Sequence, residues 1–102
     1  MKSLTLIHRL LLIANLPKKG GSVSFAIKSD IIDKTKLTQE EITKYEISDT
    51  DVGVKFNKEG GKVKFDIKYT DAECVFIEKF LNSLDKEEKL TDATYSLFKV
   101  FC

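Results

Sequence analysis

The chain has 102 residues, which is enough for one domain with a single hydrophobic core. Hydrophobic residues make up 42% of it and charged residues 32%, which excludes an intrinsically disordered chain, and no stretch approaches the roughly eighteen apolar residues of a membrane span. A formal net charge of +1 excludes a general attraction to nucleic acid or membranes, and two cysteines are too few for a secreted disulfide framework, so we expect a soluble cytoplasmic protein.

The first predicted element is a helix over residues 4–16, with Ser3 as its expected N-cap and Pro17 after its end. Its apolar residues form two adjacent stripes, Leu6, Leu10 and Ile13 on one side and Ile7, Leu11 and Ala14 on the next. Apolar side chains therefore nearly encircle the helix. This pattern predicts either a central helix that its own fold covers, or a helix whose second face is covered by a partner.

Two further helices are expected before residue 46. Residues 22–35 alternate at first like a strand, but the long continuation with Lys and Asp favours a helix. Thr38 and Glu41 then match a capping box, in which each side chain accepts a hydrogen bond from the backbone of the other residue. This motif predicts a short helix that ends near Tyr45.

A β-hairpin is predicted for the next part of the chain. Apolar and polar residues alternate over 52–57 and again over 62–68, on either side of Gly60 and Gly61, which we expect in the turn. The strand period assigns one set of side chains to the inward face: Val54, Phe56, Val63, Phe65 and Ile67.

Two helices close the predicted fold. Thr70 and Glu73 repeat the capping box before a helix that runs to about Leu84, and Thr91 can cap a last helix. The expected architecture is an α+β fold with about five helices packed on one antiparallel β-hairpin, in the order α-α-α-β-β-α-α. We expect residues 1–102 to form a single domain.

The sequence contains no recognisable catalytic or metal-binding constellation. His8 is the only histidine and lies in an apolar helix, and Cys74 and Cys102 lack the paired spacing of a zinc site. Residues 18–22, Lys-Lys-Gly-Gly-Ser, could hold a phosphate on exposed backbone amides, but without a preceding strand they fit a helix stop and turn better. We therefore expect no enzyme, no cofactor, no metal and no small-molecule substrate.

Lysines supply the best candidate site. Strand period places most of them on the outward face of the predicted hairpin, with Lys58 in its loop and Tyr69 at its end. The candidate partner-binding residues are Lys55, Lys58, Lys62, Lys64, Lys68 and Tyr69. They could contact a phosphate backbone or an acidic protein surface, or they could simply protect a sheet edge from aggregation. Without outward aromatic residues, such a face would not stack bases.

Charge is segregated along the chain. Residues 1–29 contain five basic residues and no acid, and residues 55–68 carry a net charge of +3. Residues 30–54 carry −4 and residues 69–102 carry −3. This distribution could give the molecule opposed basic and acidic faces, although most charge runs are solvated surface.

Two resemblances follow from these residues. Three helices before a hairpin resemble a winged helix, and residues 37–42, Leu-Thr-Gln-Glu-Glu-Ile, resemble the start of a helix-turn-helix unit. However, no base-reading helix follows Tyr45, and Glu46, Asp49 and Asp51 would repel DNA phosphates.

The whole pattern, including Leu16 to Gly20, Leu37 to Glu41, Thr70 to Leu84 and the ending Leu97 to Phe101, resembles small phage and prophage proteins. That resemblance implies a non-enzymatic inhibitor that docks on a host protein or ribonucleoprotein complex in the host cytoplasm, as anti-CRISPR proteins do, with RNA or phosphate-backbone contact as an option. The alternatives are a winged-helix-like nucleic-acid-binding regulator and a virion or assembly protein.

Overall fold

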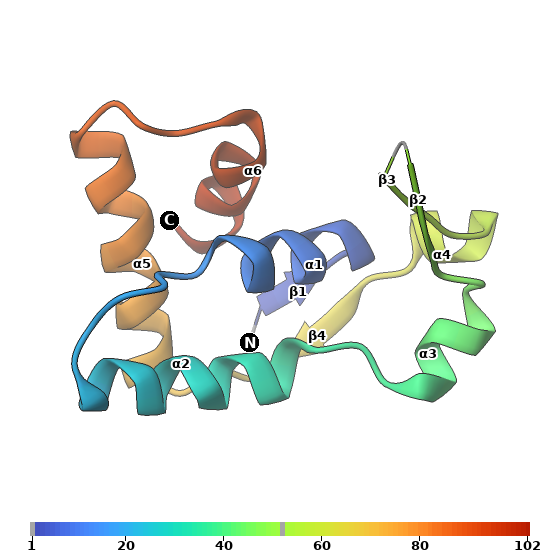
Figure 1. Ribbon diagram of the computed structural model, residues 1–102, viewed down its shortest axis with the longest axis horizontal. Helices are drawn as coiled ribbons and strands as arrows, with labels where there is room; N and C mark the ends of the chain where they lie inside the picture. The colour runs from blue at the N-terminus through green and yellow to red at the C-terminus, as the bar shows by residue number, and fades with distance from the viewer. Residues whose placement is uncertain (1, 52) are drawn as a thin grey trace.

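A computed structural model describes residues 2–51 and 53–102, and these form six helices and four short strands (Figure 1). In chain order the elements are β1 (Lys2–Leu4), α1 (Leu6–Asn15), α2 (Ser22–Thr35), α3 (Gln39–Lys44), β2 (Ser48–Thr50), β3 (Gly53–Lys55), α4 (Lys58–Lys62), β4 (Phe65–Ile67), α5 (Asp71–Lys86) and α6 (Asp92–Phe101). The α+β class is confirmed. The expected order is matched only roughly, because one more helix and two more strands are present.

The main core lies where α1, α2, α5 and α6 meet the sheet formed by β1 and β4 (Figure 1). Leu12 and Leu16 of the α1 segment pack there with buried residues of every neighbouring element. The remaining members of the buried cluster are Leu4, Ile31, Tyr69, Ile77, Leu81, Leu97 and Phe101. A helix near the middle of the fold explains why so many apolar residues occur within residues 4–16.

The predicted helices over residues 22–35 and from 71 onward are confirmed, and both capping boxes form. The Thr38 hydroxyl accepts the Glu41 N–H at 3.1 Å, and the Thr70 hydroxyl accepts the Glu73 N–H at 3.2 Å. The first helix begins later than expected, because Thr5 and not Ser3 is its N-cap. Residues 2–4 are extended instead and form β1.

The predicted hairpin across residues 52–68 is wrong. Residues 58–62 form the short helix α4, so the chain does not turn back at Gly60 and Gly61. β3 pairs with β2, with Asp49 opposite Val54, and β4 pairs with β1, with Leu4 opposite Phe65. The predicted strand residue Val52 lies outside the described part of the chain.

Local capping and long-range pairing explain this difference. The Asn57 side chain accepts the Gly60 N–H at 2.8 Å, which starts a helix where the sequence suggested a turn. Gly53 has a φ of 124°, a left-handed conformation that glycine adopts readily, and it stands at the start of β3 in the hairpin that does form. Of the five expected inward residues, Phe56, Val63, Phe65 and Ile67 are partly buried, whereas Val54 is exposed.

Candidate functional site

Arg9 organises the inner side of α1. Its side chain is almost fully buried, and its guanidinium lies 4.6 Å from the centre of the Phe65 ring. It donates four hydrogen bonds, to the carbonyl oxygens of Thr35 (2.9 Å) and Lys36 (2.8 Å) and to both carboxylate oxygens of Glu41 (2.6 and 3.0 Å). The hydrogen bonds from Arg9 hold the pKa of the Glu41 carboxyl below its usual range. This arrangement fixes α1 against the end of α2 and the start of α3.

His8 closes the capping box at the start of α1. Its Nδ1 accepts a hydrogen bond from the Thr5 N–H at 3.3 Å, while its own N–H donates to the Thr5 hydroxyl at 3.1 Å. Partial burial lowers the pKa of the imidazole, and the Lys64 ammonium lowers it further.

The outer side of α1 is not covered by the rest of the fold. Ile7 is 50% exposed, although Leu6 and Leu12 on the inner side are fully buried. Two adjoining pockets of about 230 and 300 Å³ lie between this side and the β2–β3 hairpin, and both are lined by Leu10 and Val54. We call them together the α1 groove; its main apolar residues are Ile7, Leu10, Leu11, Ile42, Val54 and Phe56.

The five predicted lysines are all exposed, but they do not share one hairpin face. Lys58 and Lys62 lie one turn apart on α4 and so project from the same side of it. None of these lysines is among the residues that line the α1 groove, but Lys55 stands in the chain between Val54 and Phe56, which do, and α4 lies against Phe56 through Gly60 and Gly61. Lys64 precedes Phe65, which pairs with Leu4 just before α1, so Lys64 lies near the start of that helix. Lys68 follows β4 at the other end of the β1–β4 pair and is separate from them.

These lysines are free of ion pairs in the described part of the chain. The salt bridges there join Arg9 to Glu41, Lys34 to Glu73, and two exposed pairs elsewhere. Within the described residues, no carboxylate therefore neutralises the charge of these lysines at ion-pair distance.

Tyr69, a predicted partner contact, belongs to the buried core, and its burial does not fit a role in docking. Tyr69 is only 6% exposed, its ring packs on Phe101, and its hydroxyl lies 2.6 Å from the Thr35 hydroxyl. The Thr35 hydroxyl itself donates to the Ile31 carbonyl at 2.6 Å, so the Tyr69 hydroxyl is the donor in the pair. Burial raises the pKa of the Tyr69 hydroxyl, as expected for a core residue.

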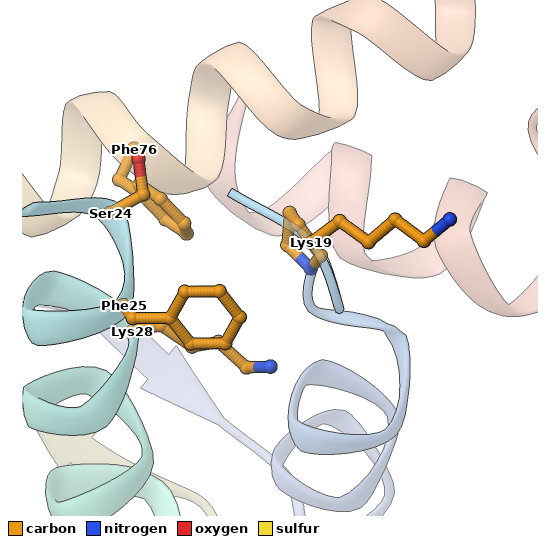
Figure 2. Close-up of a pocket in the computed structure, with 6 residues that line it drawn as sticks. Lys19, Ser24, Phe25, Lys28 and Phe76 are labelled. Carbon is orange, nitrogen blue, oxygen red and sulfur yellow. The ribbon is translucent and has the colours of Figure 1, made fainter. Parts of the chain in front are cut away.

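A third hollow, of about 150 Å³, lies between the loop after α1, the first turns of α2, and α5 (Figure 2). It is lined by Pro17, Lys19, Ser24, Phe25, Lys28 and Phe76. Figure 2 shows the rings of Phe25 and Phe76 entering from α2 and α5, with the Lys28 side chain beside Phe25. The sequence prediction missed this hollow because Phe25 and Phe76 are far apart in the chain and come together only through packing of α2 on α5.

The described residues contain no group of three or more His, Cys, Asp or Glu side chains arranged to hold a metal ion. Over the same residues, no helix combines the length and apolar character needed to cross a membrane. Cys74 and Cys102 are both free thiols.

Comparison with known proteins yields no relative. No protein-family model matches this sequence, and neither a similar curated protein nor a similar solved structure was found. The features of this molecule that bear on its function are therefore the α1 groove, the lysines beside it and the hollow of Figure 2.

Proposed function

We propose that this protein is a non-catalytic interaction module that docks on another protein through the α1 groove and the lysines beside it. The proposal rests on the outer side of α1. The apolar side chains on this side line an open groove, although a small domain could have buried them in its core. Exposed contiguous apolar surface on a monomer is typical of a protein-binding site.

The lysines define the chemistry of the partner. Lys55 stands between Val54 and Phe56 of the groove, and Lys58 and Lys62 lie on α4, whose Gly60 and Gly61 lie against Phe56. These lysines and Lys64 form no ion pair among the described residues. A partner that inserts apolar side chains into the groove and carries acidic residues around them would match this surface. Apolar side chains surrounded by acidic residues are found on proteins, so we expect the partner to be a protein. If the gene is carried by a phage, docking would block a host complex in the cytoplasm.

Charge reversal tests this proposal. The doubly substituted variant Lys58→Glu and Lys62→Glu should capture at least tenfold less of the specific partner from an extract of the native host, because both side chains project from one side of α4 and would meet acidic groups. The measurement is a quantitative pull-down with the tagged protein, with bound proteins identified by mass spectrometry.

A matched control variant distinguishes the effect of charge reversal at the groove from a general effect of lost positive charge. Lys79 and Lys86 are exposed lysines on one side of α5, so Lys79→Glu with Lys86→Glu makes the same change of charge away from the groove. This control should capture as much partner as the unchanged protein. Equal capture by both double variants, with both folded by circular dichroism, would show that the lysines beside the groove are not the docking site.

A second candidate is direct nucleic-acid binding in the manner of a winged helix. The order α1, α2, α3 and the β2–β3 hairpin resembles that fold, but α3 has only six residues and the hairpin carries Asp49 and Asp51. Duplex binding that weakens steeply with salt and that Lys58→Glu and Lys62→Glu abolish would favour this candidate over protein docking. Self-association in sedimentation would instead favour an assembly role.

A further inference from the structure

The strongest feature outside the α1 groove is the hollow of Figure 2, which combines aromatic rings with ammonium groups. Figure 1 shows that the loop between α1 and α2 lies at the opposite end of the molecule from α4 and the β2–β3 hairpin. Docking of a partner at the α1 groove therefore does not explain the hollow of Figure 2.

The basic residues near this hollow are free to bind a ligand. Residues 1–29 contain five basic residues and no acid. Two of these are engaged elsewhere, because Lys2 lies over the Phe101 ring and Arg9 is paired with Glu41. The other three, Lys18, Lys19 and Lys28, belong to the loop and to α2, and none of them is in a salt bridge within the described chain, although Lys28 lies over the Phe25 ring at the hollow itself.

The aromatic residues make the hollow different from an ordinary basic surface. Phe25 is 42% exposed, although burying its ring would stabilise the fold, and the Lys28 ammonium lies 5.1 Å from the centre of that ring. Helical spacing puts Ser24, Phe25 and Lys28 on the same side of α2. One helix face thus presents a hydroxyl, a flat apolar ring and a positive charge toward the same space.

Lys19 completes the set from the loop. In Figure 2 its side chain is extended away from the two rings, with its ammonium in open surroundings. Lysine has a flexible four-carbon stem, so this ammonium can reach a phosphate bound at the mouth of the hollow. No acidic residue is among those that line the hollow.

We infer that the hollow is a binding site for single-stranded nucleic acid that takes one nucleotide, with its base against Phe25 and its phosphate between Lys19 and Lys28. An aromatic platform beside a positively charged track is the usual chemistry by which proteins hold single strands without reading their sequence. A volume of about 150 Å³ is too small for a duplex or a protein helix. This inference goes beyond the proposed function and uses a different end of the molecule.

The probe is a fluorescein-labelled octamer of thymidine, titrated with the protein at low salt and followed by fluorescence anisotropy. A second octamer of the same backbone without bases measures the contribution of the phosphates alone. The site predicts saturable binding of the thymidine octamer, and binding of the abasic octamer that is weaker by roughly fivefold to a hundredfold, the range expected for one stacked base.

Two variants locate the binding. Phe25→Leu should bring the affinity for the thymidine octamer down to that for the abasic one, and its exposed position makes it a mild change for folding. Lys28→Gln should reduce the slope of log affinity against log salt by about 0.7, the value for one lost phosphate contact on a single strand. Lys86→Gln, which removes the same charge at the last turn of α5, should leave both quantities unchanged.

Three outcomes would overturn the inference: absence of saturable binding to the thymidine octamer, equal affinity for the two octamers, or equal losses from Lys28→Gln and Lys86→Gln. The last two would mean that the octamer is attracted by surface charge in general. Failure here is distinguishable from failure of protein docking, because partner capture by the lysines of α4 is measured on different variants.

Discussion

At the residue scale, the two polar residues that interrupt the first helix are structural. Arg9 is buried and donates to two backbone carbonyls and a carboxylate, while His8 closes the capping box with Thr5. A buried guanidinium is tolerated because its N–H groups find acceptors, whereas an unpaired one would cost several kcal/mol. The sequence marked both residues as interruptions of an apolar helix, but nothing local revealed that Thr35 and Lys36 would supply acceptors for Arg9.

The lowered pKa of His8 predicts a pH dependence of stability. Partial burial of the imidazole, and then the Lys64 ammonium, disfavour its protonation in the folded state and lower its pKa there. The unfolded chain therefore takes up the proton first, and stability falls as the pH drops below the ordinary imidazole value of about 6.5. Urea unfolding midpoints measured from pH 7.5 to pH 5.5 should decrease.

The variant His8→Gln supplies the control for this effect. Glutamine at the same helix position can accept the Thr5 N–H as in an ordinary capping box, but it does not titrate. Its urea midpoint should be nearly constant between pH 7.5 and pH 5.5. If the variant lost stability over this range as steeply as the unchanged protein, the His8 imidazole would not be the group responsible.

At the scale of elements, the helices follow from local signals and the strands do not. The capping boxes at Thr38 and Thr70 and the spacing of apolar residues are short-range information, and the helices that they predict are present. The pairing of β1 with β4 joins residues more than sixty positions apart, and no local pattern encodes it. The alternation over residues 62–68 correctly indicated an extended segment but not its partner.

The candidate site could be predicted from the sequence only in part, for the same reason. The exposed lysines could be recognised from the sequence because residues 55–68 are rich in them, and an uncovered face of the first helix was one of two open alternatives. The burial of Tyr69 and the approach of Phe25 to Phe76 depend on packing between distant elements. Neither has a local signal.

The short helix α4 can be tested through its two glycines. A Cβ atom at Gly60 would lie 3.0 Å from Leu6 Cδ1 and 3.1 Å from Tyr45 Cβ, so Gly60→Ala should destabilise the fold by about 1–3 kcal/mol through overpacking. A Cβ atom at Gly61 would have its nearest contact at 3.4 Å, and alanine favours a helix over glycine by up to about 1 kcal/mol. Gly61→Ala should therefore be neutral or slightly stabilising.

Urea unfolding of the two variants distinguishes this structure from the hairpin that the alternating pattern suggested. In a hairpin turn either glycine could need a positive φ, so alanine at both positions would be costly. Similar destabilisation by Gly60→Ala and Gly61→Ala would thus argue against a helix at residues 58–62.

At the scale of the whole molecule, α1 is in contact with the core on one side and with solvent on the other. Its inner side holds Leu6, Arg9 and Leu12, and its outer side carries Ile7 toward the α1 groove. The lysines of β3 and α4 lie at that end of the molecule, and the hollow lined by Phe25 and Lys28 lies at the other (Figure 1). With one site at each end, the molecule would be able to bind a partner protein and a single strand of nucleic acid within the same assembly.

The docking claim is tested most directly by footprinting of the complex that the tagged protein forms in the native host extract. Lysine acetylation, read by mass spectrometry with and without the captured partner, reports which ammonium groups become covered. We predict strong protection of Lys55, Lys58, Lys62 and Lys64, and unchanged labelling of Lys79 and Lys86 on α5. Protection of the α5 lysines with full labelling of the α4 lysines would contradict the proposed docking surface.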